Sequence, residues 1–493
     1  MGNIKQLAGQ TAVYGVSSIL GRIINYLLVP LYTRVFLPHE AAIYVELYAY
    51  MAMLAVILTY GMETAFFRYS ETSEHPDEVY STAFFSILIS TSIFLLTTIG
   101  LRHSIARVMG YEGKTEYIVY FLLILSLDAI SAIPFAWLRA QQKAWTFALI
   151  RLANIGANVA ANLILILLLP YLFKHFHATW LPITSGKPEV SAIFISNLIA
   201  SALALVLLIP YILRAKPLFH FKLWKEMFRY AWPLVIFGLA GVVNETIDRI
   251  LLKYLLPPTT AMHDLGIYGM CFKISVFIVI FIQAFRYAAE PFFFRQAKDI
   301  HAPKTYAQVM NYFIIVCFLM FAGIMLFMDV FKFFVGEKYY DGLIIVPLLL
   351  LGHIFLGIYY NLSVWYKVTG KTRYGAWFSL IGTAVVLVLN FLLIPRMGYM
   401  GSAWANFSCY LIMMVLSWAY GQKYYPIPYR LDNFFLYLFL AIVLWLAGTY
   451  LSPGVLWMRL ITNSFLFLGF VGFILCREPE LLRMLVSIKL RNP

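Results

Sequence analysis

Long apolar stretches follow one another along the whole chain, separated by short polar segments. Each stretch has about 18 to 25 residues, which is enough for a helix to cross about 30 Å of hydrocarbon. No polar segment between them exceeds about 20 residues, so the pattern leaves no room for a soluble catalytic domain. We predict fourteen membrane spans: 12–35, 42–67, 79–101, 117–138, 146–170, 190–213, 231–254, 266–290, 307–328, 343–366, 374–394, 399–420, 432–451 and 456–476.

Part of this pattern repeats after 228 positions, or 227 in one case, over about 135 residues. The repeat relates spans 1–5 to spans 7–11, and six spans per repeat is an even number. The second copy therefore enters the bilayer in the same orientation as the first, which predicts a parallel pseudo-two-fold repeat. The matching positions are Tyr26-Leu27-Leu28 and Pro30 with Tyr254-Leu255-Leu256 and Pro258, Phe66-Phe67-Arg68 with Phe293-Phe294-Arg295, Lys143 with Lys371, and Asn162 with Asn390.

The predicted fold is an all-α integral membrane protein of about 14 transmembrane helices. It has an N-terminal six-helix lobe (1–213), a basic cytoplasmic linker (214–230), a C-terminal six-helix lobe (231–422), and two additional helices with a basic tail (423–493). An extra loop at about 171–189 interrupts the repeat in the first lobe.

Composition agrees with a membrane protein, because 62% of the residues are hydrophobic and only 12% are charged. The net charge of +14 does not indicate nucleic-acid binding, since an excess of Lys and Arg is typical of cytoplasmic loops. With a cytoplasmic N-terminus, about 21 Lys and Arg face the cytoplasm and about 11 face the other side. Both termini are therefore predicted to be cytoplasmic. The four cysteines lack the spacing of metal ligands, so we expect no metal site.

Ionisable residues inside predicted spans are the first candidates for function, because a charge at bilayer depth is costly unless it faces water, a partner or a cavity. They gather on spans 1, 2, 7 and 8, with others on spans 4 and 5. Two pairs, Glu245 with Arg249 and Arg286 with Glu290, are spaced i,i+4 and are equally well explained by mutual neutralisation. The candidates are Arg22, Glu63, Asp128, Arg151, Glu245, Asp248, Arg249, Lys273, Arg286 and Glu290.

Span 5 carries a polar stripe of Arg151, Asn154, Asn158 and Asn162, spaced so that all lie on one helix face. Two interpretations stand beside each other. The asparagines either contact a substrate or hold helices together by hydrogen bonds. Asn390 repeats Asn162 among apolar neighbours, which favours the second interpretation for Asn162.

No motif of a hydrolase, a metalloprotease or a nucleotide-binding loop occurs in the chain. The sequence therefore predicts a protein that is not an enzyme and needs no cofactor.

Several short motifs carry a resemblance to a known family. They are Pro30-Leu31-Tyr32-Thr33-Arg34 leading to Leu37-Pro38, Gly61-Met62-Glu63 leading to Arg68, Asn244 with Asp248-Arg249 followed by Gly266-Ile267-Tyr268 and Lys273-Ile274, and Gly370-Lys371-Thr372 leading to Asn390, Ile394-Pro395, Gly398 and Gly401-Ser402-Ala403. In these the chain resembles, over nearly its whole length, the polysaccharide-unit (Wzx-type) flippases of the multidrug/oligosaccharidyl-lipid/polysaccharide (MOP) exporter superfamily.

The resemblance implies a MATE- and lipid-flippase-like fold in the bacterial cytoplasmic (inner) membrane. It implies a transporter that flips an oligosaccharide on a polyprenyl pyrophosphate, for the synthesis of O-antigen, capsule or exopolysaccharide. Polysaccharide polymerase and assembly proteins are the expected protein partners. Pyrophosphate needs Arg or Lys at depth. Arg22, Arg249, Lys273, Arg286 and Arg151, with Asn154 and Asn158, are therefore head-group candidates, and Glu63, Asp128, Glu245, Asp248 and Glu290 are candidates to bind a coupling H⁺ or Na⁺.

Three alternatives stay open. A lipid II flippase shares this fold and a cationic cavity. A multidrug exporter of the same superfamily usually has twelve spans and a less cationic cavity. A membrane-embedded polysaccharide polymerase or glycosyltransferase would be an enzyme, and such enzymes normally carry a large external loop or an acidic motif that this chain does not show.

Overall fold

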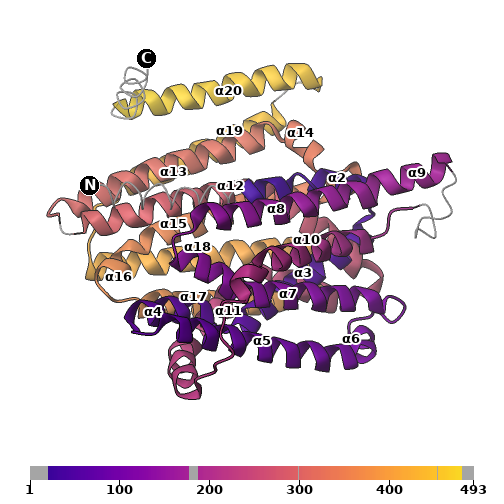
Figure 1. The fold of residues 1–493 in the computed structure, drawn as a ribbon. Coiled ribbons are helices and arrows are strands. Elements are labelled where there is room, and N and C mark those ends of the chain that lie inside the picture. Colours follow the sequence, from indigo (N-terminus) through magenta and orange to yellow (C-terminus); the bar gives the residue numbers. More distant parts are fainter. Residues whose placement is uncertain (1–19, 177–186, 298, 452–453, 480–493) are drawn as a thin grey trace, which may run out of the picture. The chain divides into compact units, whose positions relative to one another are not determined.

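The computed structural model describes residues 20–176, 187–297, 299–451 and 454–479. These residues form helices without any strand (Figure 1). Within them, twelve helical segments are long and apolar enough to cross a membrane. The segments are Pro38–Thr72, Pro76–Gly100, Thr115–Ala140, Ala144–His175, Ser191–Ile212, Pro258–Gln296, Ala302–Leu326, Glu337–Val368, Arg373–Met397, Tyr399–Tyr424, Leu431–Tyr450 and Leu456–Arg477. They confirm the all-α membrane fold and coincide with twelve of the fourteen predicted spans.

The other two predicted spans, 1 and 7, are not among these twelve segments, for separate reasons. Residues 12–19 of span 1 lie outside the described residues, as do 1–11, most of the predicted loop 171–189, and the tail from 480. The described part of span 1 ends in α2 (Val29–Val35). Span 7 is α11 (Phe221–Leu255), a helix of 35 residues whose C-terminal half is polar because it carries Glu245, Asp248, Arg249 and Lys253.

Span 2 is divided into two helices, α3 (Pro38–Thr59) and α4 (Met62–Thr72). Proline at the first position suits the start of α3, because its missing N–H would be unpaired there in any case. The break follows from the backbone of Tyr60 and Gly61, whose φ angles are 32° and 69°. Gly61 tolerates this conformation because it has no Cβ. The break places Glu63 in the first turn of α4.

The chain divides into two compact units. Unit 1 comprises Met1–Met270 and Val386–Ser402. Within it α10 packs against α7 and α8, α5 packs against α7, and α11 packs against α3 and α4. Its further helices are α5 (Pro76–Gly100), α6 (Arg102–Val108), α7 (Thr115–Ala140), α8 (Ala144–Leu163), the π-helical turn η1 (Ile164–Leu168), α9 (Leu169–Phe176) and α10 (Ser191–Ile212).

Unit 2 comprises Cys271–Val385 and Ala403–Pro493. Helix α13 (Ala302–Leu326) packs against α15 (Val346–Leu362), α19 (Leu431–Tyr450) and α20 (Leu456–Arg477), so the two additional C-terminal helices belong to this unit. The boundaries of the two units differ from those of the two predicted six-helix lobes. The division into lobes therefore stays a prediction. The remaining elements of unit 2 are α14 (Met328–Phe331), η2 (Lys332–Phe334), η3 (Glu337–Ile345), α16 (Val364–Val368), and parts of α12 (Pro258–Gln296), α17 (Arg373–Met397) and α18 (Tyr399–Tyr424).

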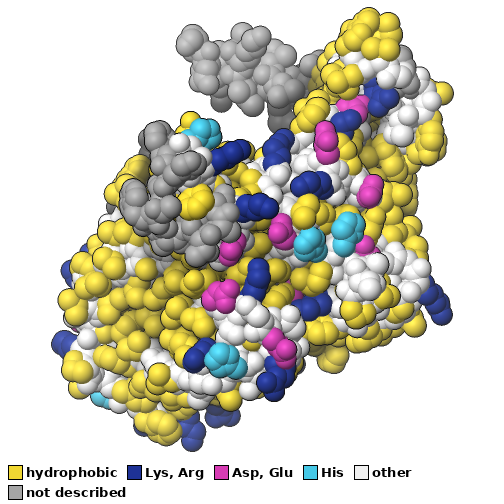
Figure 2. Space-filling view, turned by 90° about the vertical axis from the view of Figure 1, so that its right-hand side faces the viewer, with side chains coloured by type: hydrophobic (Ala, Val, Ile, Leu, Met, Phe, Trp, Pro, Cys, Tyr) yellow, Lys and Arg dark blue, Asp and Glu magenta, His cyan; other side chains and the backbone are white. Residues whose placement is uncertain are grey.

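Large apolar side chains are exposed along most of the long helices, among them Leu96, Trp145, Phe439 and Phe465. Figure 2 shows hydrophobic side chains over much of the face that it presents. Such a surface suits contact with lipid chains and would be unfavourable in water.

Candidate functional site

A charged cluster in unit 1 joins span 1 to α11. Asp248 is 1% exposed and accepts hydrogen bonds from the Tyr268 hydroxyl and from the backbone N–H of Arg249 (2.8 Å). The Arg249 charge lies within electrostatic reach of Tyr26 and Tyr44. Two tyrosine hydroxyls and a buried carboxylate therefore lie within electrostatic reach of the half-buried Arg249.

Two more predicted residues belong to the same cluster, because Arg22 and Glu245 also lie within electrostatic reach of Tyr26. Unlike Asp248, the Glu245 side chain is exposed. The structure therefore brings Arg22, Glu245, Asp248 and Arg249 together. One acid of the cluster is fixed in the interior and the other is accessible.

A second cluster lies between α7, α8 and α10 of unit 1. The Ser201 hydroxyl donates a hydrogen bond of 2.8 Å to Asp128, and Arg151 is the nearest opposing charge. The Arg151 guanidinium lies 4.2 Å from the centre of the Phe135 ring, in a cation–π contact. Both charged side chains are exposed at the surface of the unit, in the middle of apolar helices.

The asparagine stripe of span 5 connects helices. Tyr32 donates a hydrogen bond to Asn162 (2.8 Å), and Asn158 donates one to Asn25 (3.0 Å). In the repeat-related position, Asn390 accepts a hydrogen bond of 3.0 Å from Ser402. These contacts favour helix packing over substrate binding for Asn158 and Asn162. Asn154 is half-buried on the same face.

An equivalent ion pair between a glutamate and a basic residue occurs in both copies of the repeat. In unit 1, Arg139 at the end of α7 binds Glu63 of α4. In unit 2, Lys367 of α16 binds Glu290 of α12. Glu290 is 227 positions after Glu63, and Lys367 is 228 positions after Arg139, so the partners keep the register of the repeat. Glu63 and Glu290 are therefore the acidic partners of two equivalent ion pairs.

Unit 2 also holds the other predicted cations. The Arg286 guanidinium lies 4.0 Å from the centre of the Tyr360 ring, and it lines a small pocket together with Glu290 and Lys367. Lys273 is half-buried and lies closer to the N-terminus of α12. Arg286 and Glu290 form one of the i,i+4 pairs expected from the sequence. Each of the two residues contacts a side chain on another helix, Arg286 the Tyr360 ring and Glu290 the Lys367 ammonium.

A buried ion pair was missed by sequence reasoning. Glu46 of α3 is 0% exposed, and the Lys253 ammonium of α11 lies 2.9 and 2.8 Å from its two oxygens. The Tyr111 hydroxyl donates a third hydrogen bond to Glu46, and Lys253 also donates to the carbonyl of Met109 (2.6 Å). The partners lie 207 positions apart, so no local spacing reveals them.

No group of three or more His, Cys, Asp or Glu side chains within the described ranges is arranged to hold a metal ion.

Comparison with known proteins gives both a family and a fold. A family model described as "polysaccharide biosynthesis protein" matches residues 7–297. Comparison with curated protein sequences finds no match.

Among solved structures, the lipid II flippase MurJ in an inward closed conformation aligns with a TM-score of 0.74 and 12% identity, over 94% of this chain and 99% of MurJ. An inward-facing multidrug resistance MATE transporter of the MOP superfamily aligns with a TM-score of 0.65 and 14% identity, over 84% of this chain and 94% of that protein. A variant of the Vibrio cholerae MATE transporter VcmN aligns with a TM-score of 0.57 and 14% identity, over 85% of this chain and 96% of that one. At these identities the likeness concerns the fold, and it confirms the MATE- and lipid-flippase-like architecture.

Proposed function

Because the chain belongs to the polysaccharide biosynthesis protein family and has the fold of MOP-superfamily transporters, we propose that it is a lipid-linked oligosaccharide flippase. Its substrate is an oligosaccharide repeat unit on a polyprenyl pyrophosphate. It moves the polar head group from the cytoplasmic to the outer leaflet of the bacterial inner membrane, for the assembly of O-antigen, capsule or exopolysaccharide.

The cluster around Arg249 is the observation that carries this proposal. A polyprenyl tail can remain in the bilayer, but a pyrophosphate needs cations and hydrogen-bond donors to replace water. Arg249 and Arg22 supply the charge, and the hydroxyl of Tyr26 lies beside them. An arginine can bind two phosphate oxygens at once, which a lysine cannot do with the same geometry.

The two acids of the cluster have different roles in the proposed cycle. Asp248 is buried next to Arg249 and holds it in place, since Tyr268 and the Arg249 backbone both donate hydrogen bonds to it. Glu245 is exposed and competes with the substrate for Arg249. A proton on Glu245 removes this competition, so proton binding and head-group binding favour each other. Na⁺ at Glu245 or at Asp128 would couple transport to a different gradient.

Alternating access moves the head group in this scheme. Two six-helix lobes rock about the head-group site, so that it opens first to the cytoplasm and then to the outside. Both termini face the cytoplasm, as the distribution of Lys and Arg predicts. Polysaccharide polymerase and assembly proteins receive the flipped substrate. The protein performs no covalent chemistry and needs no cofactor in this scheme.

Lipid II is the second candidate substrate, because the MurJ alignment covers 94% of this chain. The MATE alignments keep a multidrug exporter as a third, weaker candidate.

Transport by the purified full-length chain in proteoliposomes tests the proposal. We expect flipping of a polyprenyl-pyrophosphate oligosaccharide and slower or absent flipping of lipid II. Efficient transport of lipid II alone would assign the protein to peptidoglycan synthesis. Export of a cationic dye without flipping of either lipid would assign it to drug transport. Elongation or hydrolysis of the glycan by the purified protein would make it an enzyme.

A further inference from the structure

Unit 2 contains an apolar groove that the proposed transport cycle does not use. It has a volume of about 260 Å³ and is lined by residues of α13, α15, α18 and α19. Ile314, Ile358, Val415 and Phe434 contribute to its walls. A groove of this size and lining accommodates a segment of a single hydrocarbon chain.

One end of the groove is polar. Arg430 lies there, directly before α19, and its side chain is 45% exposed. Asn311 of α13 lines the same end. The predicted topology puts this end of α19 on the cytoplasmic side. Basic residues at the cytoplasmic end of a groove between membrane helices are typical of sites for anionic lipid head groups.

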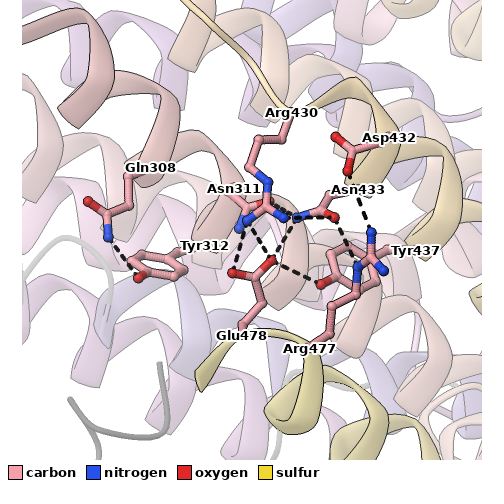
Figure 3. A network of polar contacts seen from close by, with 9 residues as sticks. All are labelled: Gln308, Asn311, Tyr312, Arg430, Asp432, Asn433, Tyr437, Arg477 and Glu478. Carbon is pink, nitrogen blue, oxygen red and sulfur yellow. Dashed lines mark hydrogen bonds and ion pairs between the residues drawn. The ribbon is translucent and has the colours of Figure 1, made fainter. Parts of the chain in front are cut away.

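A network of hydrogen bonds fixes Arg430 in this position (Figure 3). Its guanidinium donates to both oxygens of Glu478 (3.0 and 3.2 Å), which is 8% exposed in its side chain. Asn433 donates to Glu478 (2.7 Å) and to Asn311 (2.9 Å), so the network joins α13, α19 and the end of α20. Because Glu478 neutralises part of its charge, Arg430 suits an anion of low charge better than a pyrophosphate.

Two hydrogen-bond donors in the lining lack a protein partner. The indole nitrogen of Trp418 and the hydroxyl of Tyr429 are both buried, and neither has a hydrogen-bond partner among the described residues. A buried polar group without a partner costs about 1 to 3 kcal/mol. Both residues line the groove, and a ligand that carries acceptor oxygens offers the kind of partner that they lack.

From these observations we propose that the groove is a binding site for an anionic bilayer phospholipid of the cytoplasmic leaflet. One acyl chain lies between α13, α15, α18 and α19. The phosphodiester contacts Arg430, and the ester oxygens accept hydrogen bonds from Trp418 and Tyr429. A phospholipid carries acceptor oxygens beside its acyl chains, whereas a plain prenyl chain carries none. The bound lipid fastens α19 to α13, α15 and α18 of unit 2.

Native mass spectrometry of the delipidated full-length protein tests this site. The probes are phosphatidylglycerol, phosphatidylcholine with the same acyl chains, and undecaprenyl phosphate. We expect phosphatidylglycerol to bind about tenfold more tightly than phosphatidylcholine. Val415→Trp fills the groove and should abolish this binding. Val443→Trp places the same side chain on an exposed position of α19 outside the lining and should leave it unchanged.

The polar end is tested separately, because Arg430→Gln alone would leave Glu478 without its cation. The double variant Arg430→Gln/Glu478→Gln keeps the network neutral, and it should lose the preference for phosphatidylglycerol while it keeps the thermal unfolding temperature. Trp418→Phe should weaken binding of both phospholipids about threefold to tenfold.

Three results would overturn the proposal. They are equal binding of both phospholipids to the wild type, unchanged binding to Val415→Trp, and displacement of phosphatidylglycerol by undecaprenyl phosphate. The last would assign the groove to a prenyl chain. Each result is independent of whether the protein flips its proposed substrate.

Discussion

The Lys253 ammonium lies 2.8 Å from a carboxylate oxygen of Glu46 and joins α11 to α3 inside unit 1. By the internal repeat, Lys253 belongs to the second predicted lobe and Glu46 to the first. The topology from the positive-inside rule places the pair near the outer membrane surface. In the proposed alternating-access cycle, this pair would close the bundle at its outer end, and outward opening would have to break it.

Loss of one partner of this pair should be much worse than loss of both. Lys253→Met leaves a fully buried carboxylate without its cation and should lower the free energy of unfolding by about 3 to 5 kcal/mol. The double variant Glu46→Gln/Lys253→Met should recover most of this loss, because no buried charge remains. Thermal unfolding in detergent measures the difference, and equal losses for the single and double variants would contradict it.

The two repeat-related ion pairs should respond differently to the exchange of Arg and Lys. Their side chains are 29–43% exposed, so each pair contributes at most about 1 kcal/mol. Lys367→Arg should be neutral, since the first copy carries an arginine in that position. Arg139→Lys should cost more, because the Arg139 guanidinium also stacks on Phe67, 5.1 Å from the ring centre.

Charge reversal completes this test. Arg139→Glu should reduce the amount of folded protein, and Glu63→Arg in the same chain should restore it. If the doubly reversed chain is no better than Arg139→Glu, the contact does not hold α4 to α7.

Gly266 should not tolerate a side chain. A Cβ atom there would collide with the backbone carbonyl of Pro38 in the first turn of α3. Gly266→Ala should therefore lower stability by at least about 2 kcal/mol. Gly156→Ala is the matched control, since nothing lies within 4 Å of its Cβ, and it should be neutral or slightly stabilising. Equal unfolding temperatures of the two variants would show that α12 does not approach α3 so closely.

Acid should weaken the contact between α14 and α20. Burial acts to raise the pKa of Asp329, but hydrogen bonds from Lys332 (2.7 Å) and Arg459 (3.0 Å) prevail and hold it below the ordinary value of 3.8. A lowered pKa stabilises the folded state above pH 3.8, and this contribution disappears as the pH falls through the folded-state value. Wild type should therefore unfold at a higher temperature than Asp329→Asn near neutral pH, and this advantage should shrink below pH 3.8. A constant difference would exclude the linkage.

The sequence was sufficient for the fold because membrane spans are a property of local composition. Each apolar run marks a helical segment, and the repeat at Asn162 and Asn390 identified residues that do prove to join helices. Side-chain partners were harder to predict, since burial depends on which helices meet. Glu46 and Lys253 sit on helices far apart in the sequence.

The paired acids were within reach of sequence reasoning. Glu63 and Glu290 obey the offset of 227 visible at Phe66 and Phe293, and Arg139 and Lys367 obey the offset of 228 visible at Asn162 and Asn390. Arg139 was not a candidate, because it follows the predicted end of span 4 and the candidates were taken from inside the spans. Comparison of the two copies for charged residues as well as apolar ones would have found both pairs. The groove beside Arg430 had no such signal, because its walls come from four helices that only packing brings together.

Binding of the substrate pyrophosphate by Arg249 can be tested by one transport measurement. Initial rates of polyprenyl-pyrophosphate oligosaccharide flipping in proteoliposomes are compared for wild type, Arg249→Lys, Arg249→Ala and Arg107→Ala, the last removing an exposed arginine on α6. We predict a loss of at least about tenfold for Arg249→Ala, partial activity for Arg249→Lys, and wild-type activity for Arg107→Ala. Wild-type rates for well-folded Arg249→Ala would exclude Arg249 from head-group binding.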